Sequence, residues 1–551
     1  MKKIAKQTAM AVLLTAAMTM PYAGGSASLA SAAEMSVSER IAIRDAVEKA
    51  GGVVEWDGQT GTVTATYGNS MLVLTIGSAQ AVLNGKGISL GEPIEIVNEK
   101  TVVPAALLQQ LQAGRAGGDT LKTRAHSEAV AKAATFIAKL AAGSFTEAYS
   151  ALGANLKAAL PGPVLEQIWK AAEQQAGPLG ERLSVAYEGN GVHHNVTFLY
   201  QGTSIPVEVA IRFDKTGLID DFSFAPAQPP SAYMKPSYDD AAKYREQEVA
   251  VGEGPFALPG TLTMPAGEGP FPAVVLVHGS GPHDRDSSIG GAKPFRDLAV
   301  GLAGEGIAVL RYEKITKEHN LKFALDPKPT LQRETVDDAL KAVKLLKGTK
   351  GVDPSRIFIA GHSQGGMAVP KMIELDTAGT IAGAAILAGP SMRYSDTLID
   401  QQELLVKRMK ELGLPTGQVE QSAAFWTGIA QMINDPQNTV ERMPAAFPLP
   451  QPYWWFEQKG YSPAESAKSQ SRPLFIAQGE NDWQVSMKQF DGWKQALQGR
   501  KDVQLKSYPK VNHLLTEYDG VSVGAEYGQS ANVSKEIVTD LAKWVNGGYR
   551  N

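Results

Sequence analysis

In the C-terminal part of the chain, short runs of consecutive apolar residues alternate with segments in which apolar residues return every three or four positions. The runs are typical of strands buried on both faces, and the segments between them are typical of amphipathic helices. Their alternation predicts an α/β fold, with helices on both faces of a mostly parallel sheet. The expected strands are 273–277, 307–311, 357–360, 384–388, 473–478 and 503–507, and the expected helices are 295–304, 334–346 and one that starts at Gln364.

One connection in this region is much longer than the others. About 85 residues separate the strand that ends at Ala388 from the next one near Leu474, and a simple crossover needs far fewer. The insertion, about 391–471, is predicted to form a helical lid. Most of its aromatic side chains are expected to attach the lid to the body, and a few to line a ligand pocket. The candidates for pocket-lining residues are Tyr453, Trp454, Trp455 and Phe456.

Two further domains are expected before residue 230. Residues 34–113 carry short strands with Gly and Asn turns, such as Asn84-Gly85, which predicts a small β-rich domain. Residues 122–226 show helical periodicity to about residue 180 and then four strand-like runs, which predicts an α+β cone. A glycine-rich linker at 113–118 and a proline-rich linker at 225–231 separate these domains from the α/β domain at 237–551.

The first 33 residues have a different pattern. Lysines precede an apolar core between Ala9 and Met20, and small residues follow up to Ala33. This order is typical of a secretory signal peptide, and the apolar core is too short to span a bilayer durably. We therefore expect a secreted, extracellular protein without a membrane span. Cleavage after Ala32 or Ala33 would change the formal net charge from −4 to about −7 by removing the lysines.

Composition narrows the function further. The chain has no cysteine and forms no disulfide, so its stability must come from core burial, which a chain of this length supplies easily. A mildly acidic chain is not expected to bind nucleic acid. The pair His193-His194 does not predict a metal site, because neighbouring strand residues point to opposite faces and no Cys or second His cluster accompanies them. We expect a solvated strand edge there, and neither a metal nor a cofactor.

The segment Arg356–Met367 carries the clearest chemical signal, because it contains the pattern G-x-S-x-G around Ser363. An apolar strand leads into the pattern and a helix follows, which is the setting in which it forms a sharp turn with an exposed serine. Gly361 and Gly365 relieve the crowding beside that turn. The free N–H groups at the start of the helix face any oxyanion that forms there. Ser363 is therefore a predicted nucleophile.

A nucleophilic serine needs a base to take its proton. The partners of a G-x-S-x-G serine follow it in the order acid, then histidine. His513 is the one histidine beyond Ser363, so it is the predicted base. The acid is expected at the end of the preceding strand. Asp482 is the predicted acid, which would orient the imidazole, and Glu480 is the alternative.

Two backbone donors are expected to stabilise the oxyanion. One is the N–H group of Gln364, the residue after the nucleophile, and the other comes from the glycine-rich loop after the strand 273–277. Ser280 is the predicted second donor. Gly279 and Gly281 are alternatives that differ by one position.

Four segments together resemble the bacterial α/β-hydrolase esterases related to dienelactone hydrolases and serine peptidases. They are His278–Asp286, Gly361–Gly366, Gly479–Asp482 and Asn512-His513. The resemblance covers about the last 310 residues and implies an α/β-hydrolase domain with a serine triad, but its motifs are not specific for the substrate. We expect that substrate to be a small-molecule ester. The resemblance also implies that Asp284-Arg285-Asp286 lies by the oxyanion loop, where we expect mainly a structural ion-pair network.

The front domains have resemblances of their own. Residues 97–107 resemble the stalk module of the copper-amine-oxidase N-terminal type, which is common on secreted proteins of Gram-positive bacteria. The resemblance implies a spacer or a contact with the cell wall or cell surface. It implies neither copper nor oxidase chemistry, because the segment has no His or Cys ligand set. The α+β cone resembles the nuclear-transport-factor-like fold, which implies an accessory or dimerising role.

Three functions fit these residues. The first is a secreted carboxylesterase that works through an acyl-enzyme on Ser363. The second is a serine peptidase or another acyl hydrolase with the same triad, and the third is a binding protein with a degenerate hydrolase domain. The sequence does not separate the first two, because the choice of substrate resides in the lid.

Overall fold

The computed structural model describes residues 40–57, 61–67, 70–83, 86–90, 92–112, 120–203, 205–227 and 231–548. The expected signal peptide (1–33), the Asn84-Gly85 turn, the glycine-rich linker and part of the proline-rich linker (228–230) lie outside the described residues. The chain forms two compact units, Met1–Ala227 and Gln228–Asn551. Within the described ranges, no helix combines the length and the apolar character that a bilayer crossing requires.

The first unit begins with a β-rich part, as predicted. Five strands pair antiparallel in chain order from β2 to β6, and a smaller sheet has the order β1-β8-β7. Inward side chains of β3 and β4, such as Val63 and Leu72, share one core with Ile43 of the helix α2. The elements are β1 (Arg40–Ala42), α2 (Ile43–Lys49), β2 (Val53–Asp57), β3 (Thr62–Tyr67), β4 (Ser70–Thr75), β5 (Gln80–Leu83), β6 (Lys86–Ser89), β7 (Glu95–Val97), β8 (Lys100–Pro104) and α3 (Ala105–Gln112).

An α+β part follows in the same unit. Its sheet is antiparallel with the order β12-β11-β10-β9, so the four predicted strands are all present. Phe136 of α4 packs against Phe222 with ring centroids 5.4 Å apart, and Trp169 of α7 packs against Phe224 at 5.5 Å. The elements are α4 (Thr120–Ala141), α5 (Phe145–Ser150), α6 (Ala154–Ala159), α7 (Gly162–Ala176), β9 (Arg182–Gly189), β10 (His194–Tyr200), β11 (Val207–Phe213) and β12 (Ile219–Pro226).

The expectation of a solvated edge at the histidine pair is right for His194 and wrong for His193. His194 is exposed at the start of β10, but His193 is buried, with its Nε2 atom 2.9 Å from Asp220 Oδ2. The local turn explains the difference. The side chain of Asn190 accepts hydrogen bonds from the N–H groups of Val192 and His193, which turns His193 inward before the strand begins.

The second unit is built on an eight-stranded sheet with the order β13-β14-β16-β15-β17-β18-β19-β20. The strands β15 to β20 run parallel to one another, whereas β13–β14 and β14–β16 pair antiparallel. This arrangement confirms the predicted mostly parallel sheet. The strands are β13 (Tyr244–Val251), β14 (Leu258–Pro265), β15 (Phe271–Val277), β16 (Ala308–Tyr312), β17 (Val352–His362), β18 (Ile381–Leu387), β19 (Leu474–Gly479) and β20 (Val503–Tyr508).

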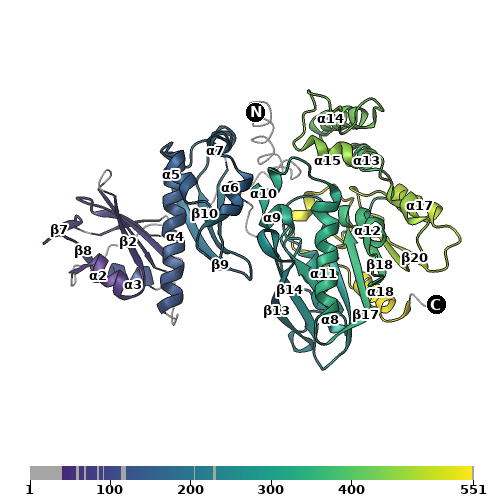
Figure 1. The fold of residues 1–551 in the computed structure, drawn as a ribbon, viewed down its shortest axis with the longest axis horizontal. Helices are drawn as coiled ribbons and strands as arrows, with labels where there is room; N and C mark the ends of the chain where they lie inside the picture. Colours follow the sequence, from purple (N-terminus) through teal and green to yellow (C-terminus); the bar gives the residue numbers. More distant parts are fainter. Residues whose placement is uncertain are drawn as a thin grey trace. The chain divides into compact units, whose positions relative to one another are not determined.

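Helices cover both faces of this sheet (Figure 1). Alternate residues of β15 enter two different cores. Val275 and Val277 join the core that includes α11, α12 and α17, whereas Val274 and Leu276 join the core that includes α8 and α18. Burial on both faces is why these strands appear in the sequence as continuous apolar runs. The helices are α8 (Pro294–Gly304), α11 (Asp337–Lys347), α12 (Gln364–Leu375), α17 (Met487–Ala496) and α18 (Lys535–Val545).

The hydrophobic pattern missed the first two strands of this sheet. The strand β14 contains Pro259, Gly260 and Pro265, which have low strand propensity. It is nevertheless fixed as a strand by pairing with β13 on one side and β16 on the other. Tertiary pairing has overridden local propensity here.

The long insertion between β18 and β19 contains four helices. They are α13 (Tyr394–Glu411), α14 (Gly417–Asn434), α15 (Pro452–Glu457) and α16 (Pro463–Ala467). In Figure 1 the first three lie together beyond one end of the sheet. Part of the insertion has a small core of its own, formed by Ile429, Ile433, Phe447, Leu449 and Phe456.

Candidate active site

Ser363 occupies the sharp turn between β17 and α12. Its backbone has φ 54° and ψ −119°, a left-handed conformation that is strained for a residue with a side chain. Neighbouring glycines make the turn feasible. A Cβ atom on Gly361 would lie 2.3 Å from the carbonyl oxygen of Gly365, and one on Gly365 would lie 2.3 Å from that of Val277. The sequence therefore folds locally into a turn that presents the serine at the carboxyl edge of the sheet.

Asp482 follows β19 and His513 follows β20 at the same edge of the sheet, and the two side chains are hydrogen-bonded to each other. The Nδ1 atom of His513 is 2.8 Å from Asp482 Oδ2, and both residues are buried. The other carboxylate oxygen, Oδ1, accepts the N–H groups of Gln484 at 2.7 Å and Val485 at 2.9 Å. The alternative acid, Glu480, accepts instead from the Ser507 hydroxyl at 2.7 Å.

The loop that carries His513 is held in place on two sides. The side-chain oxygen of Asn512 accepts from the N–H of Leu514 at 3.0 Å and from the hydroxyl of Thr516 at 3.0 Å. On the other side, His362 donates from Nε2 to the carbonyl oxygen of His513 at 2.7 Å, and the two rings are 4.8 Å apart. The imidazole of His513 therefore packs against the residue that directly precedes Ser363.

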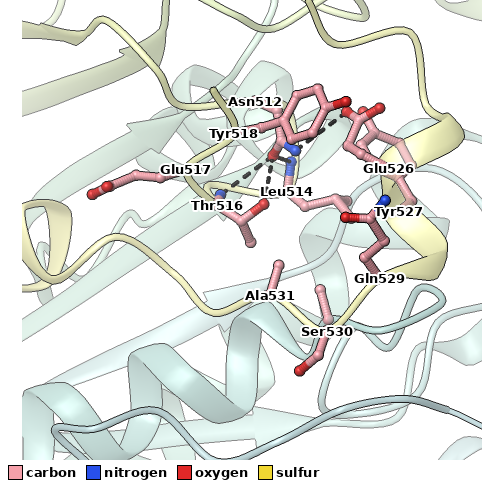
Figure 2. A pocket seen from close by; sticks show the side chains of 11 residues that line it. Asn512, Leu514, Thr516, Glu517, Tyr518, Glu526, Tyr527, Gln529, Ser530 and Ala531 are labelled. Atoms are coloured by element: carbon pink, nitrogen blue, oxygen red, sulfur yellow. Dashed lines mark hydrogen bonds between the residues drawn. The ribbon is translucent and has the colours of Figure 1, made fainter. Parts of the chain in front are cut away.

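A small cavity lies beside the same loop (Figure 2). Its lining comes from the His513 loop, the segment 526–531 and Ala292, and Figure 2 shows the side chains of Asn512 and Thr516 hydrogen-bonded within this wall. Its volume of about 60 Å³ is far below the several hundred cubic ångströms of ordinary ligand pockets. This cavity therefore does not have the size of a substrate site.

The glycine-rich loop after β15 passes close to Ser363. A Cβ atom on Gly279 would lie 3.1 Å from the Cβ of Ser363 and 3.5 Å from its Oγ. The side chain of the next residue, Ser280, interacts with that of Tyr394, the first residue of the helix α13. Burial raises the pKa of Tyr394 to about 12, so this side chain is a neutral phenol at neutral pH.

The charged cluster that follows this loop forms the expected ion-pair network. Arg285 contacts Glu248 Oε1 at 2.7 Å and Glu313 Oε1 at 2.9 Å. Asp286 contacts Lys293 at 3.2 Å and Arg311 at 3.3 Å. These pairs attach the loop to β13 and to the end of β16.

The four predicted pocket-lining aromatics all belong to α15 but lie in different surroundings. Phe456 packs in the core of the insertion, which fits a structural role. Trp454 is buried against the main core, with its ring centroid 5.4 Å from that of Tyr394. Trp455 and Tyr453 are partly buried. Trp454 is thus joined through Tyr394 to the loop of Ser280.

Two buried histidines, His278 and His362, and the partly buried His283 flank the strand ends near the serine without converging on a common point. The Nε2 atoms of His278, His283 and His362 contact three different backbone carbonyl groups, those of Asp284, Ser280 and His513. Such an arrangement fits hydrogen-bonded packing, because metal ligands would point at one position. Burial lowers the pKa of His362 to about 3, with the nearby charge of His513 as a second cause, and burial also lowers the pKa of His278 well below its ordinary value.

These depressed pKa values predict an acid-sensitive domain. Below pH 6.5 the unfolded chain protonates His278 and His362 while the folded chain does not, so the free energy of unfolding should fall as the pH drops from 6.5 towards 4. The variant His362→Gln, which keeps a donor for the His513 carbonyl, should reduce this slope by about one proton. Urea unfolding of both proteins at pH 7.5, 6 and 5 measures how the free energy of unfolding changes with pH. An unchanged slope in the variant would show that His362 is protonated in the folded state.

The sequence pattern gave no role to three residues that the structure places around the predicted triad. Tyr394 contacts Ser280, Asn512 organises the His513 loop, and Lys314 donates to the carbonyl oxygen of Gly279 at 2.7 Å. One feature of the sequence could have identified Lys314. It lies shortly after the carboxyl end of the predicted parallel strand 307–311, and side chains in that position gather at the edge where ligands bind.

Comparisons with known proteins agree with this architecture. Residues 269–519 match the family described as serine aminopeptidase, S33, and residues 40–114 match the copper amine oxidase N-terminal domain. Esterase EstD of Thermotoga maritima is 31% identical over 411 residues, which cover 74% of this chain and 93% of EstD. The human mitochondrial acyl-coenzyme A thioesterase 2 is 24% identical over 277 residues, which cover 49% of this chain and 47% of that protein.

Solved structures give a more distant match. Est1E from Butyrivibrio proteoclasticus aligns with 18% identity and a TM-score of 0.35 over 55% of this chain and 98% of that chain. The similarity to EstD is longer than the second unit alone, so it extends into the first. The match at residues 40–114 confirms the predicted resemblance of the front domain. Given its serine turn, its mostly parallel sheet and this extended similarity, the chain belongs to the family of α/β-hydrolase esterases that includes EstD.

Proposed function

We propose that the protein is a secreted carboxylesterase that cleaves carboxylic esters through an acyl-enzyme on Ser363. The observation that carries the proposal is the buried 2.8 Å hydrogen bond between His513 Nδ1 and Asp482 Oδ2, on a loop that packs against the residue preceding Ser363. A carboxylate on Nδ1 holds the proton there and leaves Nε2 unprotonated, which is the form of imidazole that can accept a proton.

The proposed reaction has two stages. As Ser363 Oγ bonds to the carbonyl carbon of the ester, Nε2 of His513 takes the hydroxyl proton. The backbone N–H groups of Gln364 and Ser280 stabilise the negative oxygen of the intermediate. The bond to the alcohol then breaks, and His513 gives its proton to the departing oxygen. Water repeats the sequence on the acyl-enzyme, releases the acid and restores the serine.

The lid supplies the apolar part of the proposed site. Trp454 is buried, its ring contacts Tyr394, and the Tyr394 side chain interacts with that of Ser280, so these side chains lie next to the proposed oxyanion donor. We place the acyl or alcohol group of the ester against this aromatic surface, with Trp455 and Tyr453 at its margin. Phe456 has a structural role, because it is enclosed in the core of the insertion.

A second candidate function has support of its own. The matching family is described as serine aminopeptidase, and one relative is an acyl-coenzyme A thioesterase. A serine peptidase or another acyl hydrolase would use the same three residues and the same donors. The identity of the leaving group, an alcohol, an amine or a thiol, would then depend on the lid.

The front domains complete the proposal. The match of residues 40–114 to the copper amine oxidase N-terminal domain supports a spacer or a contact with the cell wall. The α4–α7 helices on the antiparallel sheet support an accessory cone of the nuclear-transport-factor-like type. Secretion rests on the leader pattern at residues 1–33. The N-terminal sequence of protein recovered from culture medium tests it, and cleavage near Ala33 is the expected result.

Substrate profiling separates the two catalytic candidates. Nitrophenyl esters of graded acyl length, peptide nitroanilides and acyl-coenzyme A thioesters would be compared at equal enzyme concentration. We expect kcat/KM for the best ester to exceed that for the best peptide substrate by at least about 100-fold, a difference of about 2.7 kcal/mol in activation free energy. Peptide hydrolysis as fast as ester hydrolysis would assign the site to the second candidate.

A further inference from the structure

Lys314 lies in an environment that lysine rarely occupies. It follows β16 and is only 2% exposed, so its ammonium group requires partners inside the protein. Two are present: its Nζ atom is 2.5 Å from Glu334 Oε1 and 2.7 Å from the carbonyl oxygen of Gly279. The first partner balances the charge, and the second is part of the loop beside Ser363.

The contact with Gly279 determines the orientation of one peptide group. The carbonyl oxygen of Gly279 and the N–H of Ser280 belong to the same planar peptide, and in a trans peptide they point in opposite directions. The ammonium on the carbonyl side therefore turns the N–H of Ser280 to the other side. Within the part of the chain that the structure describes, no protein acceptor is hydrogen-bonded to this N–H.

The other carbonyl groups of the loop are engaged as well. Ser280 O accepts from His283 at 2.7 Å, Gly281 O from the Thr316 hydroxyl at 3.0 Å, and His283 O from the N–H of Lys314 at 3.1 Å. The loop is thus attached to its surroundings through its oxygens. Its amide groups remain available on the side where Gly279 approaches Ser363.

Glu334, the partner of Lys314, belongs to a turn that also contacts Gln364, the other proposed oxyanion donor. Glu334 lies in η3 (Gln332–Val336), a π-helical turn at the start of α11, and such turns are frequent at functional sites. The next residue, Thr335, is 3.3 Å through its hydroxyl from the side-chain nitrogen of Gln364. One irregular turn therefore supports the loop of Ser280 and the residue that follows the nucleophile.

We propose that the buried pair Lys314–Glu334 positions the oxyanion hole by fixing the Gly279–Ser280 peptide and strengthening its N–H as a donor. This inference rests on the proposed function, because it needs an oxyanion at Ser363. A hydrogen bond from an ammonium to the peptide oxygen polarises the peptide and makes its N–H a better donor. Glu334 offsets the charge of Lys314, so the pair acts mainly through orientation. Lys314 is a positioning residue and does not touch the substrate.

The test compares three variants on the best nitrophenyl ester. Lys314→Met should lower kcat by about 10- to 100-fold, less than the loss of a whole donor, and leave KM within about twofold. The double variant Lys314→Met/Glu334→Met leaves no unpaired buried charge and should show the same loss. Lys322→Met is the matched control, since Lys322 is another buried lysine and its ammonium donates to a backbone carbonyl outside the Ser280 loop, that of Pro255 at 2.7 Å. It should keep the kcat of wild type.

A second readout separates positioning from general destabilisation. A trifluoromethyl ketone that forms a tetrahedral adduct with the serine should bind the Lys314 variants more weakly by the same factor as the loss in kcat, whereas a non-reactive ester analogue should bind unchanged. Wild-type kcat in a folded double variant, or a change confined to KM, would overturn the inference. If the wild-type protein neither hydrolyses esters nor reacts with fluorophosphonate, the proposed function itself has failed.

Discussion

Replacing Ser363 with alanine should abolish ester hydrolysis, with a loss of about 10⁶ in kcat that leaves only the rate due to binding and the oxyanion donors. The reason is chemical, because alanine offers no atom that can bond to the carbonyl carbon. The fold should persist. Alanine fits the space of serine, and the turn depends on the close approaches at Gly361 and Gly365. Steady-state kinetics and labelling with a fluorophosphonate probe measure the effect.

The control for this prediction is Ser507→Ala. Ser507 lies on β20 and is hydrogen-bonded to Glu480, so the variant should keep both the label and the activity. Equal labelling of wild type and Ser363→Ala would mean that the probe reacts elsewhere, and the assignment of the nucleophile would be wrong. Absence of labelling in folded wild-type protein would favour a binding protein with a degenerate hydrolase domain.

Asp482→Asn should lower kcat by about 10⁴ while the protein stays folded. The surroundings of the carboxylate determine how the amide must lie. Its Oδ1 position accepts two backbone N–H groups, from Gln484 and Val485, so the amide oxygen of asparagine is held there. The NH₂ group then faces Nδ1 of His513 and donates to it. The imidazole is left with its proton on Nε2, where it cannot take the proton of Ser363.

Glu480→Gln provides a matched control for that variant, because it makes the same chemical change two residues away. Its side chain bonds Ser507 and does not contact the imidazole, so its kcat should stay within about twofold of wild type. A large loss in Glu480→Gln together with a small one in Asp482→Asn would reverse the assignment of the acid. The pH dependence of kcat in both variants provides a second measurement.

The sheet shows which strands local sequence patterns can predict and which they cannot. Strands with helices on both sides bury both faces, so β15 and the buried segments of β17 and β19 contain continuous apolar runs, which the hydrophobic pattern predicts. The strand β14 was not, because its two prolines and a glycine disfavour a strand until β13 and β16 pair with it. The helix expected at 334–346 begins as a π-helical turn, a detail that periodicity does not encode.

In the candidate site, too, some features follow from the sequence and others depend on tertiary contacts. By itself the sequence determined the α/β class, the serine turn, the order of its partners and the position of the insertion. Each of these depends on residues close together in the chain or on a fixed order along it. Only the tertiary structure decided that Asp482 rather than Glu480 contacts His513, that Phe456 is enclosed in the insertion while Trp454 contacts Tyr394, and that Lys314 reaches Gly279. The physical reason is that these contacts join residues on different strands and loops, whose distances are set by how the sheet and its helices pack.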